Sequence, residues 1–108
     1  MNYLWNLIFK RKLGNKAASE LISVLEETLK FLEASEDSIW SDMEVKQTVD
    51  LINNAIQALK TTRRVRISKL YYIFLPTAPL QEISIENGWA EEFLELAGKF
   101  DICMARYC

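Results

Sequence analysis

The sequence predicts an all-α protein, a compact bundle of four to six helices in which residues 1–108 form a single domain. Half of the residues are apolar, as in ordinary globular proteins, and apolar positions recur at intervals of three and four. Only three glycines and two prolines are available for turns, too few for a many-stranded sandwich or barrel. A chain of this length can bury one ordinary hydrophobic core.

The first clear helical pattern covers residues 16–34, with Asn15 as the predicted N-cap. Its main apolar face consists of Ala18, Leu21, Ile22, Leu25, Leu29 and Leu32. A second stripe lies beside it and consists of Ala17, Val24, Thr28 and Phe31. Such a wide apolar face indicates a central helix that contacts several neighbours.

A polar connection at residues 35–41 precedes the next helix. Ser41 and Glu44 have the spacing of a capping box, in which each side chain accepts from the other residue's backbone N–H. The second helix is therefore expected to begin at residue 42.

The apolar stripe of this second helix continues without glycine or proline as far as Phe74. One helix over residues 42–74 would be about 50 Å long. A domain of this size has a radius of gyration of only about 13 Å. We therefore predict a break at residues 60–63, with Thr61 or Thr62 capping a third helix.

Proline and glycine delimit the C-terminal elements. The third helix should end at Phe74, because the residue before Pro76 is excluded from helical geometry. Pro79 suits the first position of a short helix over residues 79–86, and Gly88 suits its end.

The last predicted helix covers residues 89–106. Its buried side consists of Trp89, Phe93, Leu96, Phe100 and Cys103. Its outer side carries Glu91, Glu92, Glu95 and Lys99, of which Glu95 and Lys99 have the spacing of an ion pair. Cys103 and Cys108 are separated by about 7.5 Å of helical rise, too far for a disulfide, so a reducing compartment is expected.

The N-terminal segment, residues 1–9, is apolar and precedes the basic residues 10–12. A secretory signal has its positive charge before the apolar run, and a membrane-spanning helix needs about 20 apolar residues. We expect a cytoplasmic protein in which this segment is a short helix docked on the core. Contact with a membrane surface through Trp5 and Phe9 is the less favoured alternative.

Charge is segregated along the chain, although the formal net charge is only −2. Residues 1–16 and 59–69 are basic, whereas residues 17–58 and 70–108 are acidic. The second basic block consists of Lys60, Arg63, Arg64, Arg66 and Lys69. Near the start of a helix these cations need anionic partners, either the chain's own acids such as Glu26, Glu33 or Asp50, which we favour, or nucleic-acid phosphates.

The acidic residues around the connection offer a candidate partner-binding surface for a basic macromolecule. It consists of Glu33, Glu36, Asp37, Trp40, Asp42 and Glu44. Trp40, a tryptophan in a polar connection, is either a plug into the core, which the sequence favours, or an interface anchor. An alternative acidic surface consists of Glu86, Glu91, Glu92 and Glu95.

The sequence argues against an enzyme. It contains no histidine, so the usual general base and the Ser/His and Cys/His pairs are absent. The three glycines are isolated and form no phosphate-binding loop, and no zinc or redox motif accompanies the cysteines. We predict no catalytic residues, no metal, no cofactor and no small-molecule substrate.

Residues 75–82 read Leu-Pro-Thr-Ala-Pro-Leu-Gln-Glu and lead into Asn-Gly-Trp and an acidic, apolar helix. This segment, residues 75–101, resembles one in small bacterial proteins of uncharacterised families, some encoded beside toxins. It departs from that pattern at Ala78, where a glycine is expected. The whole chain is also similar in type to the all-helical immunity proteins of contact-dependent growth inhibition and related polymorphic toxin systems.

This resemblance implies an immunity protein that neutralises a cognate toxin, a basic protein such as a nuclease, by stoichiometric binding. Two alternatives remain open. One is a homo-oligomeric scaffold that uses the N-terminal aromatics and the second stripe of the helix over residues 16–34. The other is weak binding of nucleic acid or a membrane surface through the two basic segments, for which we see no recognition-helix pattern.

Overall fold

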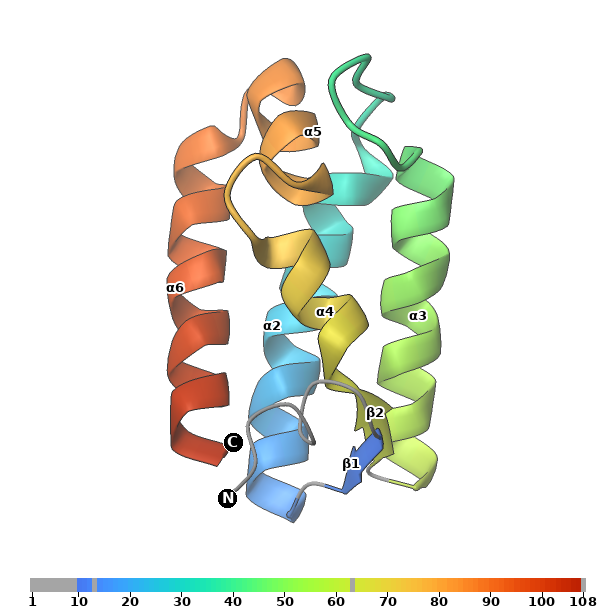
Figure 1. Ribbon diagram of the computed structural model, residues 1–108, viewed down its shortest axis with the longest axis vertical. Helices are drawn as coiled ribbons and strands as arrows, with labels where there is room; N and C mark the ends of the chain where they lie inside the picture. The colour runs from blue at the N-terminus through green and yellow to red at the C-terminus, as the bar shows by residue number, and fades with distance from the viewer. Residues whose placement is uncertain (1–9, 13, 63, 108) are drawn as a thin grey trace.

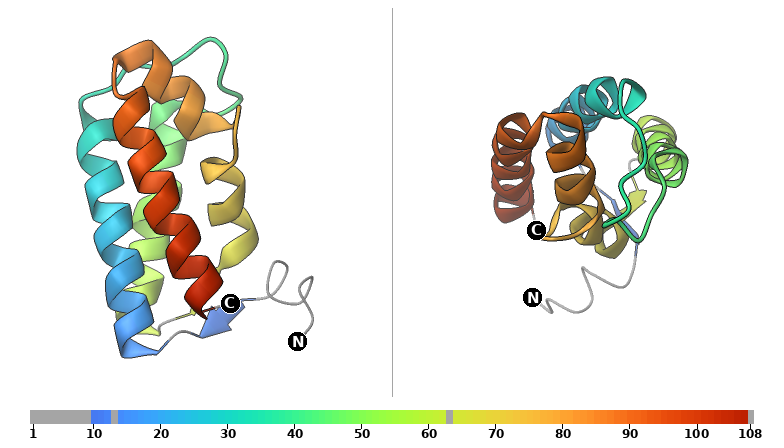
Figure 2. Two further views of the ribbon diagram at one scale, coloured as in Figure 1. Left: turned by 90° about the vertical axis from the view of Figure 1, so that its left-hand side faces the viewer. Right: turned by 90° about the horizontal axis from the view of Figure 1, so that it is seen from above.

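Three long helices, α2 (Asn15–Glu33), α3 (Val45–Thr61) and α6 (Ala90–Tyr107), run along the long axis of the computed structural model (Figure 1). Two shorter helices, α4 (Ile67–Phe74) and α5 (Pro79–Asn87), complete the bundle (Figure 2). The structure describes residues 10–12, 14–62 and 64–107, so the apolar segment 1–9 and Cys108 lie outside it. The five described helices confirm the predicted all-α bundle.

Helix α2 is central, because it packs against both α3 and α6. Its main apolar face is anchored by Leu21, Leu25 and Leu32, which are completely buried. The second stripe is also turned inward, since Ala17, Val24 and Thr28 are buried and Phe31 stacks on Trp89. This stripe is therefore not available as an interface between copies of the chain.

The N-caps of the first two long helices differ from the predictions. Gly14, not Asn15, is the N-cap of α2. The Ser41–Glu44 capping box is also wrong: Glu44 is itself the N-cap of α3, and its box partner is Gln47, whose Oε1 accepts from the Glu44 N–H at 2.8 Å. Ser41 Oγ is instead bonded to the backbone of Met43, and Asp37 accepts from the Val45 N–H at the later start of the helix.

The helical structure is interrupted between α3 and α4 as predicted, but a strand lies between the two helices. β2 (Arg64–Arg66) pairs antiparallel with β1 (Lys10–Lys12). The predicted capping of the third helix by a threonine is wrong, because Thr62 is the C-cap of α3. Three-residue strands are too short to show an alternating pattern, so the sequence does not reveal this pair.

The turns around α5 follow the predicted chemistry. Pro79 occupies the first turn of α5, and Gly88 ends it in the left-handed conformation with φ of 81°. The turn accommodates Ala78 because that residue is extended, with φ of −92° and ψ of −179°. The left-handed residue of this turn is instead Thr77, with φ of 60°, whose N–H donates to Gln81 Oε1 at 2.6 Å.

Helix α6 buries the side that the sequence predicts. Trp89, which precedes it, and Phe93, Leu96, Phe100 and Cys103 are all buried. Phe100 stacks on Phe74 with ring centroids 4.2 Å apart, which ties α6 to α4. On the outer side Lys99 Nζ lies 3.5 Å from Glu27 Oε2 of α2, so its ion pair is with α2 and not with the predicted Glu95.

Candidate partner-binding surface

The loop between α2 and α3, residues 34–44, covers one end of the bundle (Figure 1). It is held to the start of α6 and the end of α5 by side-chain hydrogen bonds. Asn87 Oδ1 accepts from the Glu36 N–H at 2.9 Å, and Asn87 Nδ2 donates to the Glu36 carbonyl at 2.8 Å. Trp89 Nε1 donates to Ser35 Oγ at 2.8 Å. These contacts join residues more than 50 positions apart and fix the path of the loop.

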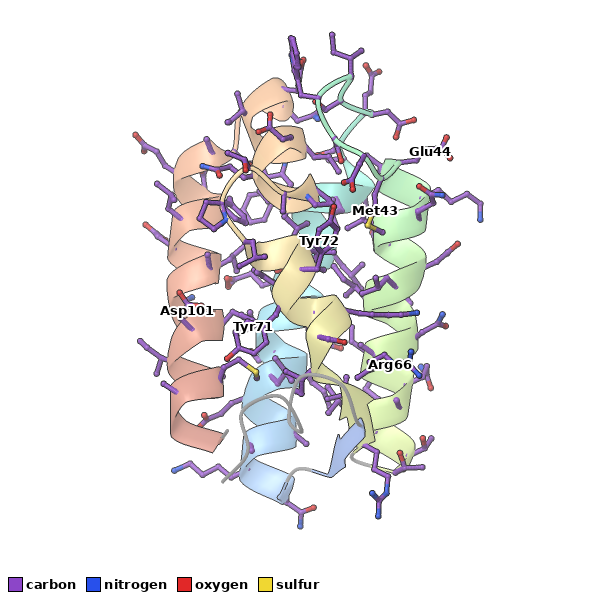
Figure 3. The ribbon with its side chains drawn as sticks, viewed as in Figure 1. Met43, Glu44, Arg66, Tyr71, Tyr72 and Asp101 are labelled. Atoms are coloured by element: carbon purple, nitrogen blue, oxygen red, sulfur yellow. The ribbon has the colours of Figure 1, made fainter. Side chains whose placement is uncertain are left out.

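The other side of the loop is attached to α3 and α4. Asp37 Oδ1 accepts from the Val45 N–H at 2.7 Å and so satisfies a donor at the start of α3. The Tyr72 hydroxyl donates to the Asp42 carboxylate, and in Figure 3 Tyr72 reaches from α4 toward this junction, beside Met43. This hydrogen bond, together with desolvation and the negative charge of Asp42, raises the pKa of Tyr72 above its ordinary value of 10.0.

Two large apolar side chains project from the loop into solvent: Ile39 is 85% exposed and Trp40 is 71% exposed. The favoured interpretation of Trp40 as a plug into the core is therefore wrong. Trp89 occupies the core beneath the loop, where it stacks on Phe31 with ring centroids 5.1 Å apart. The buried side chain of the loop itself is Ser38, whose Oγ accepts from the Trp40 N–H at 3.1 Å.

The structure brings the six predicted partner-binding residues to the same end of the bundle. They are Glu33 at the end of α2 and, on the loop, Glu36, Asp37, Trp40, Asp42 and Glu44, all exposed. Three of the acids also act locally, Asp37 and Glu44 as helix caps and Asp42 as the acceptor for Tyr72. Among the described residues, Glu33 and Glu36 have no side-chain partner.

The alternative acidic surface lies beside this loop. Glu86 precedes the Asn87 that binds the loop, and Glu91 and Glu92 are in the first turn of α6. These three acids and Glu95 are exposed. The sequence patterns did not single out the exposed Ile85 and Leu94 on the same two helices, because isolated apolar residues on a polar face carry no periodic signal.

The sequence favours pairing of the second basic block with the chain's own acids. Among the described cations of this block, one has such a partner. Lys60 Nζ lies 3.8 Å from Glu26 Oε2, as expected. Arg64, Arg66 and Lys69 make no ion pair with any described residue. Among the described residues, the expected pairing with the chain's own acids is therefore not found for these three cations.

In the part of the chain that the structure describes, no three His, Cys, Asp or Glu side chains gather as a possible metal site. No helix in this part is both long enough and apolar enough to cross a bilayer. The chain matches no protein-family model, no curated protein and no solved structure.

Proposed function

We propose that the protein is an immunity protein that neutralises a cognate toxin by stoichiometric binding. The contact is made by the loop end, which we define as Glu33, Glu36, Asp37, Ile39, Trp40, Asp42 and Glu44. The observation that supports it is the exposed pair of Ile39 and Trp40 on a loop that hydrogen bonds hold in place, surrounded by carboxylates. An exposed tryptophan with an acidic rim is typical of an interface anchor.

The size of Trp40 is sufficient for an anchor. Burial of roughly 150 Å² of its side chain in a partner's pocket is worth about 4 kcal/mol before the costs of association are subtracted. Those costs include the ordering of loops at the interface. The hydrogen bonds from Asn87, Trp89 and Tyr72 order this loop before any partner arrives, so the cost of ordering is small.

The charge of the loop end fits a basic partner. A nuclease holds nucleic-acid phosphates in a positively charged cleft, and an acidic surface competes with the substrate there. Complementary charge mainly raises the association rate, whereas the buried anchor sets the lifetime of the complex. Glu33 and Glu36 are best placed for this role, because no described side chain engages their carboxylates.

The test is binding of the purified chain to the protein encoded by the neighbouring gene, measured by calorimetry together with protection of cells that express that protein. Trp40→Ala is expected to weaken binding at least about thirtyfold, the loss typical of a hot spot, and to abolish protection. Ile102→Ala is the matched control, since Ile102 is 64% exposed on α6 and away from the loop, and it should change binding less than about threefold.

Charge is tested separately with Glu33→Gln/Glu36→Gln, for which we expect a slower association at low salt and a smaller effect at high salt. Asp101→Asn, an exposed carboxylate on α6, is its control. If Leu94→Ala weakens binding and Trp40→Ala does not, the contact lies on the alternative acidic surface. Binding that survives Trp40→Ala combined with the two glutamate changes contradicts the proposed loop-end contact.

A further inference from the structure

A groove of about 560 Å³ separates α3 from the β2–α4 segment. Its floor is apolar and consists of Leu51, Ala55, Val65 and Leu70. The α3 wall carries the side-chain amides of Gln47 and Asn54. A volume of this size is in the range of small-molecule sites, which are mostly apolar with a few converging polar groups.

The opposite wall of the groove is basic. Arg64 and Arg66 flank the buried Val65 on β2, and Lys69 follows in the first turn of α4. Figure 3 shows Arg66 next to α3, near the end of the bundle opposite the α2–α3 loop. All three cations are exposed and line the groove.

Three other cations of the described chain have carboxylate partners, whereas the exposed Lys16 and Lys30 of α2 make no ion pair with a described residue and do not line the groove. Lys46, Lys60 and Lys99 lie 3.3, 3.8 and 3.5 Å from an aspartate or glutamate oxygen. Asp50 also lines the groove, but it is already 3.3 Å from Lys46. Three cations without an ion-pair partner among the described residues thus meet at one wall of a cavity.

From this geometry we propose that the groove binds a small amphipathic anion, a molecule with a phosphate or carboxylate group and an apolar body. The head group would lie against Arg64, Arg66 and Lys69, since guanidinium groups bind phosphates and carboxylates through paired, charge-assisted hydrogen bonds. The apolar body would cover Leu51, Ala55 and the rest of the floor. This site is separate from the loop end and does not depend on the proposed contact with a toxin.

The test uses octyl phosphate and octanoate as probes, with inorganic phosphate as the head group alone, followed by backbone amide NMR shifts. We expect either octyl compound to shift amides of residues 47–58 and 64–70 with a dissociation constant near or below about 1 mM. Inorganic phosphate should bind at least about tenfold more weakly, because it lacks the apolar body. The octyl compound that binds more tightly identifies the preferred head group.

Two variants make the test specific. Arg64→Gln/Lys69→Gln is expected to weaken binding at least about tenfold, whereas Lys16→Gln/Lys30→Gln, exposed cations on α2, should leave binding unchanged. Asn54→Trp fills part of the groove from an exposed position of α3 without removing a core side chain and should weaken binding at least about tenfold, so it tests the site even if the charge variant fails to fold.

Three results overturn the proposal. The first is the absence of shifts with both octyl compounds, and the second is shifts that cluster outside the groove. The third is unchanged binding in both the charge variant and Asn54→Trp. In the first of these cases, binding of a short single-stranded RNA would indicate that the cations serve a nucleic-acid surface.

Discussion

Asn87 holds the α2–α3 loop through hydrogen bonds to Glu36, a contact that we call the clamp, and its loss should lower the free energy of unfolding. Asn87→Ala removes three hydrogen bonds, to the Glu36 N–H at 2.9 Å, the Glu36 carbonyl at 2.8 Å and the Ile83 carbonyl at 2.9 Å. The Glu36 groups are exposed and can bind water instead, so each bond is worth only about 0.5 kcal/mol, the lower end of the usual range. Alanine recovers about 0.5 kcal/mol of helix propensity at the end of α5.

The expected net loss is therefore about 1 kcal/mol in the free energy of unfolding, which urea denaturation monitored by circular dichroism measures directly. Asn53→Ala is the matched control, because Asn53 is exposed on α3 and its side chain makes no hydrogen bond to a described residue. The control should be neutral or slightly stabilising. Asn87→Asp should have a lower free energy of unfolding than Asn87→Ala, since its carboxylate would face the Glu36 and Ile83 carbonyl oxygens.

Hydrogen exchange locates the effect. The Glu36 amide, which donates to Asn87, should exchange faster in Asn87→Ala, and amides in the middle of α2 should show no more than the global loss. If Asn87→Ala matches Asn53→Ala within about 0.3 kcal/mol and the Glu36 amide keeps its protection, other contacts hold the loop and the clamp is refuted.

Three further predictions follow from single residues. Gly88→Ala should destabilise the fold by about 1 kcal/mol, because φ at this position is 81°. Gly98→Ala should instead stabilise it by about 0.5–1 kcal/mol, because Gly98 lies in the interior of α6 with open space around it. Urea denaturation of both variants shows whether the two changes in unfolding free energy have opposite signs. The pKa of Tyr72 is raised, so its hydrogen bond to Asp42 stabilises the fold below pH 10 and is lost as the pH rises through the folded pKa. Ultraviolet titration of the tyrosines should therefore show a late phase that is missing in Tyr72→Phe. Trp40→Ala should change the unfolding free energy by less than about 0.5 kcal/mol, since the side chain is 71% exposed, and a larger loss would mean that it packs on the core.

Local chemistry was enough to predict the helix boundaries that proline and glycine impose. The residue before Pro76 is extended, Pro79 is in the first turn of α5, and Gly88 ends it. The buried faces of α2 and α6 also follow from spacing alone, because an amphipathic helix has only one way to cover its apolar stripe.

The position of Trp40 was not predictable from its neighbours. A large apolar residue is more often buried than exposed, and the sequence does not reveal that Trp89, 49 positions later, fills the core below the loop. The same holds for the amide of Asn87, which in sequence is only the residue before a helix-ending glycine. Contacts between distant segments determine both the exposure of Trp40 and the role of the Asn87 amide, and the periodicity of the sequence contains no information about such contacts.

The position of the cations around β2 and α4 is not explained by helix stability. Helix α4 has no acidic residue in its first turn, its N-cap is Arg66, and Lys69 lies within that turn. A cation at this end opposes the helix dipole and costs about 0.3–1 kcal/mol, and no described carboxylate forms an ion pair with it. Lys60, by contrast, is favourably placed in the last turn of α3 and is paired with Glu26. An anion bound in the groove would neutralise the unpaired charges and interact favourably with the same helix end, which accounts for their position as stability alone does not.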